Sequence, residues 1–277
     1  MNVELIKTKF EEIGARVKFV ETTRFRDGMP PNLAISIDVL KDRKGEFFAI
    51  SERQTNTPFE VAVIDAKVAE RHLLLMLKQG KVGKETVSKF LCGHDERQWF
   101  TCAVPEAAGA KNVLDAMEAL KPESVVNAQK GTLKKKHLEH AGTRRKNEVY
   151  IRQGEWFFTK ANIDPNPKLI HKNEPITNGR RGAKPHICEE LYRTGGTTVM
   201  VHRSYAPNGL TLKEFHDQYS SDKDKLGWRQ MTRDAQVYVR GYIRHSDHKT
   251  INLKGWYSVR LNREQEAKAS RAVAFLD

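Results

Sequence analysis

The stretch "VYVRGYIRHSDHKTINLKGW", from Val237 to Trp256, carries the clearest secondary-structure pattern in the chain. Its first eight residues alternate between apolar side chains and tyrosine or arginine. Alternate side chains of an extended strand share a face, so this pattern predicts a strand with one buried side. "HSDH" is rich in turn-forming residues, and a second β-type segment follows it. The stretch therefore predicts a β-hairpin.

The two faces of the first strand differ in chemistry. The face expected to pack on a core carries Val237, Val239, Gly241 and Ile243. The other face carries Tyr238, Arg240, Tyr242 and Arg244. Aromatic rings stack on unpaired bases while arginines contact phosphates, so this second face is a candidate surface for single-stranded nucleic acid. The alternative interpretation is ordinary packing of tyrosine and arginine on a solvated face of a sheet.

The turn of the hairpin contains residue types used in metal and acid/base sites. We interpret "HSDH" as a turn whose histidines contact phosphate, because a metal site needs further ligands from other elements. A catalytic centre in this half of the chain would draw on His186, Glu190, His245, Asp247 and His248. We expect no cofactor, except a divalent metal if the protein is a nuclease.

Segments flanking the hairpin are also mostly β-like. "EVYIRQGEWFF" (148–158) predicts one strand, and "TTVMVHRSY" (197–205) predicts another after the Gly195-Gly196 turn. "PNGLTLKEFHDQY" (207–219) predicts a turn leading into a helix, with Thr211 and Glu214 spaced as a capping box. The last segment, 262–276, predicts a terminal helix that begins at an Asn262 cap.

Charge divides the chain into two parts. Residues 1–128 contain 19 Lys/Arg and 19 Asp/Glu, whereas residues 129–277 contain 29 and 16. The net charge of +13 therefore belongs to the C-terminal part, which suggests that this part contacts a polyanion. We predict a neutral domain over residues 1–128, a basic linker over 129–146 and a basic β-rich domain over 147–277.

Basic residues in two segments join the Tyr/Arg face as predicted nucleic-acid contacts. In the linker they are Lys134, Lys135, Lys136, Arg144, Arg145 and Lys146. In the glycine-flanked loop "NGRRGAK" they are Arg180, Arg181 and Lys184. Glycines let backbone amides approach phosphate oxygens, although the loop lacks the spacing of a nucleotide-binding P-loop.

The N-terminal part predicts a mixture of helices and strands. Helical spacing of apolar residues extends from Val3 to Val17, and a second, buried helix is expected over Val68–Gln79 and a third over Ala107–Leu120. Strands are expected at "NLAISIDVL" (32–40), "EFFAIS" (46–51), "FEVAVIDA" (59–66) and "WFTCAV" (99–104).

This order of elements, with Asp38 on one strand and Asp65-Ala66-Lys67 ending another, resembles the PD-(D/E)xK nuclease core. The resemblance implies that two acidic residues hold a divalent metal and that the lysine orients the attacking water. The Pro-Asp element is absent, and "SIDV" stands in its place. We therefore take no site residue from this resemblance.

Composition limits the class of protein. The chain is 39% hydrophobic and 30% charged, which is typical of a globular protein. Its longest apolar run, Leu73–Leu77, is too short to cross a bilayer. The three cysteines form no CxxC pair, which favours reduced thiols and a cytoplasmic location.

These patterns predict an α+β protein of two domains: an N-terminal mixed α/β domain and a β-rich C-terminal domain with a terminal helix. The predicted function is binding of RNA or single-stranded DNA through the basic C-terminal part. Two alternatives remain open, a metal-dependent nuclease and a protein-interaction scaffold. The N-terminal part is expected to bind a protein partner or another copy of the chain, and no membrane is expected as a partner.

Overall fold

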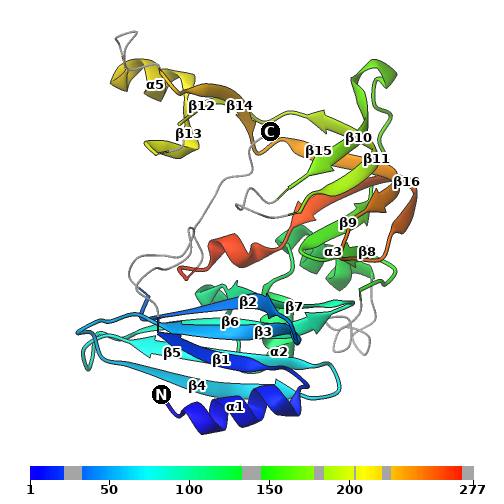
Figure 1. Cartoon of the computed structure of the whole chain (residues 1–277). Coiled ribbons are helices and arrows are strands. Elements are labelled where there is room, and N and C mark those ends of the chain that lie inside the picture. The colour runs from blue at the N-terminus through cyan, green and yellow to red at the C-terminus, as the bar shows by residue number, and fades with distance from the viewer. Residues whose placement is uncertain (22–32, 133–144, 178–183, 203, 220–225, 270–277) are drawn as a thin grey trace. The chain divides into compact units, whose positions relative to one another are not determined.

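The computed structural model describes residues 1–21, 33–132, 145–177, 184–202, 204–219 and 226–269. The chain forms two compact units (Figure 1). The first comprises Met1–Phe157 and Leu261–Ala272, and the second comprises Phe158–Arg260 and Val273–Asp277. Helices and mainly antiparallel strands are arranged in several sheets, so the fold belongs to the α+β class.

The first unit contains two sheets, with strand orders β1-β3-β2 and β4-β5-β6-β7. Its elements are α1 (Val3–Glu12), β1 (Val17–Glu21), β2 (Ile35–Asp42), β3 (Gly45–Glu52), β4 (Phe59–Lys67), β5 (His72–Gln79), β6 (Thr86–Asp95), β7 (Gln98–Val104), η1 (Glu106–Ala108), α2 (Val113–Ala119), α3 (Glu123–Thr132), β8 (Tyr150–Gln153) and η4 (Arg263–Glu266). The strands expected near residues 32–40, 46–51, 59–66 and 99–104 are confirmed as β2, β3, β4 and β7.

Strand β5 lies at the centre of the core of the first unit. Leu73, Leu75 and Leu77 belong to the same buried cluster as apolar residues of α1, whereas Leu74 belongs to the cluster formed with α2. A strand covered on both faces carries a continuous apolar run and not an alternating one. The helix predicted over Val68–Gln79 is therefore wrong, because a short apolar run fits a doubly covered strand as well as a helix.

Two other predicted helices are shorter than expected. The first ends at Glu12, before Gly14 adopts a positive φ of 77°, and Val17 begins β1. The helix predicted over Ala107–Leu120 starts only at Val113, where the Asn112 side chain accepts the Asp115 N–H. None of the helices in the described part of the chain is long and apolar enough to cross a membrane.

The predicted terminal helix is also wrong in extent. Asn262 does act as a cap, since its side chain accepts the Glu264 N–H, but the helix is the single 3₁₀ turn η4. Ala267 then has extended backbone angles, φ −71° and ψ 136°, which end the helical path. The remaining part of that prediction, residues 270–276, lies outside the described residues.

The second unit contains most of a six-stranded sheet with the order β10-β11-β15-β16-β9-β8, of which β8 belongs to the first unit. Its elements are β9 (Trp156–Lys160), η2 (Pro167–Leu169), β10 (Ile170–Ile176), β11 (His186–Thr194), β12 (Thr197–His202), β13 (Ala206–Thr211), α5 (Leu212–Gln218), β14 (Arg229–Arg233), β15 (Gln236–Arg244) and β16 (Ile251–Leu261). The predicted hairpin is confirmed as the antiparallel pair β15 and β16. The strand predicted over residues 148–158 is two strands, β8 and β9, separated by a turn at Gly154.

The second unit also contains a smaller sheet with the strand order β13-β12-β14. In sequence, its strand β13 leads directly into helix α5. The predicted capping box of α5 is confirmed: the Thr211 side chain accepts the Glu214 N–H, and the Glu214 carboxylate accepts the Thr211 N–H. Satisfying these amides stabilises the start of a helix of only seven residues.

The compact units divide the chain elsewhere than the predicted domains do. The boundary between the units falls within β9, and α3 continues through residue 129, where the linker was predicted to begin. Residues 133–144, the greater part of the predicted linker, lie outside the described residues.

Candidate functional site

Strand β15 has the two faces that alternation predicts. Val237, Val239 and Ile243 are buried, whereas the tyrosines and arginines between them are half-buried or exposed. Neighbouring strands add further aromatic and charged side chains to the outer face. We call this outer face, with Tyr192, Tyr238, Arg240, Tyr242, Arg244 and Trp256, the aromatic face.

Two residues of the aromatic face pack closely on their neighbours. The ring of Tyr238 stacks on Tyr192 of β11, with centroids 6.3 Å apart. The Arg240 guanidinium lies 4.8 Å from the ring centroid of Trp256 and forms an ion pair with Glu190. These contacts are the kind that the packing interpretation expects at this end of the strand, and a carboxylate partly balances the charge of Arg240.

The other end of β15 is more open. Tyr242 is 47% exposed. The Tyr242 N–H donates to Glu189 Oε2 at 2.8 Å, next to Gly241 with its φ of 82°. Arg244 donates to Asn173 Oδ1 at 2.7 Å and is exposed. Tyr242 and Arg244 therefore offer a ring and a cation to a ligand.

A pocket of about 350 Å³ opens on the aromatic face. It is lined by Asp164, Pro165, Pro167, Ile170, Lys172, Glu190, Arg240 and Trp256. The lining combines an aromatic floor, two prolines and charges of both signs. Such a pocket has the size of a small-molecule site and can hold one planar ring.

The predicted basic contacts are only partly described. Lys134, Lys135, Lys136, Arg144, Arg180 and Arg181 lie outside the described residues. Arg145 forms ion pairs with Asp95 and Glu96 in the first unit, and Lys146 is exposed. Lys184 forms an ion pair with Asp247, with 2.7 Å between Nζ and Oδ1. Of the three cations of these two segments that the structure describes, Arg145 and Lys184 thus have acidic partners.

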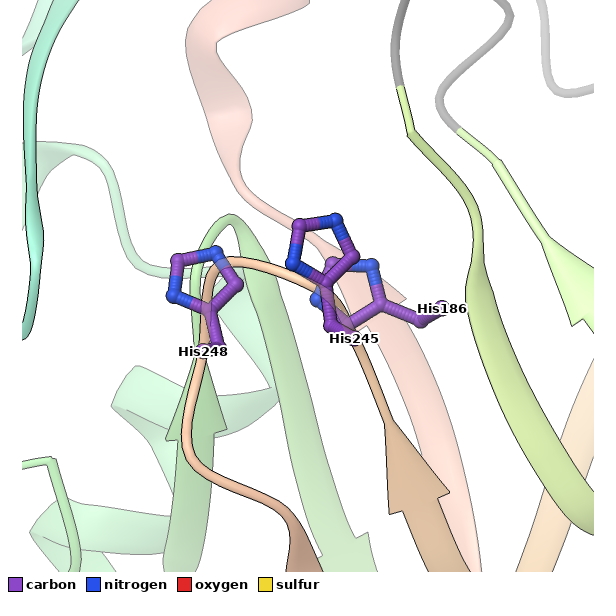
Figure 2. A group of neighbouring side chains, drawn as sticks. All are labelled: His186, His245 and His248. Carbon is purple, nitrogen blue, oxygen red and sulfur yellow. The ribbon is translucent and has the colours of Figure 1, made fainter.

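Three of the predicted catalytic candidates lie together (Figure 2). His186 begins β11 and is 1% exposed, whereas His245 and His248 lie in the half-buried turn after β15. The His186 and His245 rings are stacked with centroids 4.2 Å apart, and the His248 centroid is 4.6 Å from that of His245. One nitrogen of each ring lies within 4.8 Å of the others.

Hydrogen bonds hold the turn and define the state of His245. The Asp247 N–H donates to His245 Nδ1 at 3.1 Å, so the proton of the neutral ring resides on Nε2. That Nε2–H donates to the Lys184 carbonyl oxygen at 3.2 Å. The ion pair between Lys184 and Asp247 connects the same two segments.

Burial determines the charge state of His186. It lowers the pKa of the imidazole to about 3, with smaller contributions from the charges of His245 and His248. Placing a cationic ring in a buried position costs desolvation free energy, and protonated neighbours would add repulsion. His186 is therefore neutral at physiological pH.

The remaining candidates do not join this cluster. The Asp247 carboxylate is directed to Lys184, and Glu190 lines the pocket beside Arg240. The two acidic residues of the nuclease resemblance belong to different sheets, Asp38 on β2 and Asp65 on β4. Asp65 Oδ2 accepts the Val113 N–H at the start of α2, which is a structural role.

Sequence patterns missed an aromatic cluster beside helix α5. The ring of His202 stacks on Tyr205 at 4.5 Å and also contacts Trp228, which in turn packs on Phe215 and Tyr219. Tyr205 is strongly exposed. The contributing segments are spread over residues 202–228, so no local spacing indicates the cluster.

No family model, curated protein or solved structure matches the chain. The function must therefore be inferred from the residues and their geometry.

Proposed function

We propose that the chain binds single-stranded nucleic acid on the aromatic face. The observation that supports this proposal best is the combination of Tyr242 and Arg244 at the open end of β15. An exposed ring provides a stacking surface that any unpaired base can use, and a neighbouring guanidinium provides a partner for phosphate. Bases within a duplex are already stacked, so this surface favours single strands.

Further features of the second unit support the same proposal. The Tyr192–Tyr238 stack and Trp256 continue the aromatic face across three neighbouring strands. The pocket beside Arg240 includes Lys172, a second cation, although Asp164 and Glu190 reduce the local positive charge. Because of these carboxylates, we expect affinity to come from stacking more than from charge at this end of the face.

The proposal is tested by the binding of a labelled single-stranded oligonucleotide to the full chain. Tyr242→Ala should weaken binding by about 5- to 150-fold, since stacking contributes roughly 1–3 kcal/mol per base, whereas Tyr242→Phe should bind nearly as wild type. Arg244→Ala should reduce the slope of log affinity against log salt by about one.

A control for non-specific charge effects is the double variant Arg43→Ala and Lys44→Ala, which removes two positive charges at exposed positions in the β2–β3 turn of the first unit. This double variant should bind as wild type. If it lost as much affinity as the Tyr242→Ala variant, binding would be non-specific and the proposal would fail. Equal binding by Tyr242→Ala and wild type would also contradict it.

The nuclease alternative is favoured by one observation, the meeting of His186, His245 and His248. If the protein cleaves nucleic acid there, replacing His245, Asp247 and His248 with alanine should abolish turnover and leave binding near normal. If these residues form only a turn beside a binding strand, no cleavage occurs with Mg²⁺, Mn²⁺ or Zn²⁺, and the same variant weakens binding only modestly. For the scaffold alternative, a protein partner should remain bound after nuclease treatment.

A further inference from the structure

The cluster of His186, His245 and His248 brings three imidazole side chains together from two segments that are nearly 60 residues apart in sequence. We propose that these three residues bind a divalent transition-metal cation, with Zn²⁺ as the best match. The inference does not depend on nucleic-acid binding, since it concerns a site at the end of β15 and not the aromatic face itself. It uses the residues of the nuclease alternative but requires only that they bind a metal, with or without cleavage.

The donor set determines which metal fits. Imidazole nitrogens suit Zn²⁺, Cu²⁺, Ni²⁺ and Fe²⁺, whereas Mg²⁺ and Ca²⁺ prefer oxygen ligands. The only carboxylate within the turn, that of Asp247, is held by Lys184 at 2.7 Å and 2.8 Å. Three histidines with the fourth position open form the ligand set of several catalytic zinc sites.

The spacing of the rings requires a limited adjustment. Nitrogens bound to one Zn²⁺ at 2.0–2.1 Å lie roughly 3.3 Å apart at tetrahedral angles, compared with separations of up to 4.8 Å here. The rings lie within 20–27° of parallel, so their lone pairs do not yet converge. His186 is fixed in the core, but His245 and His248 lie in a turn outside the paired strands and can rotate toward it.

One hydrogen bond already prepares His245 for this role. The carbonyl of Lys184 accepts the Nε2–H of His245, which leaves Nδ1 as the basic nitrogen. Histidines that bind metals commonly donate their second N–H to a backbone carbonyl, because this fixes the tautomer and the ring orientation. Binding through Nδ1 replaces the hydrogen bond from the Asp247 N–H, 3.1 Å long, with a metal bond.

The burial of His186 also favours a metal ligand. Its ring is 1% exposed and stacked against His245, so the surrounding core holds it in position for a bound cation. The competing interpretation is a stack of three neutral rings that serves only to pack the end of the sheet. That interpretation predicts no selective affinity for any metal.

The experiment is a titration of the chelator-treated full chain with Zn²⁺ by calorimetry. We expect about one Zn²⁺ per chain with affinity in the low micromolar range or below, and no measurable heat with Mg²⁺. His248→Ala and His245→Ala should each lower the affinity by at least about 100-fold, since even loss of a supporting partner costs 10–100-fold. His248 is the better position because it is less buried than His186 and its loss disturbs no strand.

His171→Ala is the matched control, because His171 is exposed on β10 of the same sheet and should leave Zn²⁺ affinity unchanged. Circular dichroism and a urea titration establish that each variant is folded. Zn²⁺ should also raise the melting temperature of the wild type and of His171→Ala but not of His248→Ala. Absence of Zn²⁺ binding by the wild type, or equal binding by a folded His248→Ala variant, would overturn the proposal.

Discussion

At the scale of single residues, burial determines chemical reactivity in this protein. The imidazole of His186 and the thiols of Cys92 and Cys188 are all buried. Burial shifts the pKa of each group in the direction that favours its neutral form. The direction differs with the sign of the charged form: the pKa of the imidazole falls to about 3, and the pKa of each of the two thiols rises to about 12. Sequence identifies these residue types but not their burial.

The cysteines offer a direct test of this burial. All three carry thiols in buried positions, so they should react with a disulfide reagent slowly in the native protein and completely in denaturant. At both pH 7 and pH 9 the native protein should react far more slowly than the denatured protein, whose exposed thiols have a pKa of about 8.5. A control thiol from Val82→Cys, at a residue that is 95% exposed, should react at once. Rapid native reaction of the wild type would contradict the burial.

At the scale of elements, β5 shows why pattern and length gave the wrong secondary structure. Six consecutive residues of "HLLLML" fit a buried helix or a buried strand equally well. The structure has a strand because β4 and β6 pair with it on both edges while α1 and α2 cover its two faces. The two paired strands are neighbours of β5 in sequence, but the helices that cover its faces come from distant parts of the chain.

Double coverage of β5 predicts that both faces matter for stability. Leu75→Ala and Leu74→Ala should each lower the free energy of unfolding by about 2–5 kcal/mol, because each leaves a cavity in a different cluster. The exposed control Val82→Ala should change it by less than about 0.5 kcal/mol. Urea titrations measure these differences. A small effect at Leu74 alone would show that its face is not packed.

At the scale of the whole molecule, the positive charge is shared between the compact units. Residues 158–260 carry 18 Lys/Arg and 10 Asp/Glu, while residues 129–157, which belong to the first unit, carry 8 and 3. The predicted contrast between a neutral and a basic domain therefore describes the two halves of the sequence better than it describes the two units. Electrostatic attraction of a polyanion can therefore involve basic residues of both compact units.

The predicted linker can be tested by limited proteolysis of the full chain. Trypsin should cut first between Lys130 and Lys146, a range that begins in the last turn of α3 and contains seven Lys/Arg. The two fragments should remain together in native gel filtration, because elements on both sides of the cut complete the first unit. Arg152 pairs with Asp95, and Glu264 Oε1 accepts the Ala103 N–H at 3.2 Å.

The cleaved protein should elute from native gel filtration as a single peak, and denaturing electrophoresis of that peak should show two bands. First cuts outside residues 130–146 would contradict the predicted boundary. Fragments that separate without denaturant would contradict the composition of the first unit.

Elements whose signals are local could be predicted from the order of the amino acids. Alternation in β15, the turn residues of "HSDH" and the spacing of Thr211 and Glu214 each act within a few residues, so the faces of the hairpin and the start of α5 were predictable. Three other features could be known only from the folded chain: β5 is a strand, Arg240 pairs with Glu190, and His186 meets His245 and His248. The first depends on packing against the distant helices α1 and α2, and the other two depend on the pairing of β11 with β15. Such contacts between distant segments create burial and proximity that no local spacing encodes.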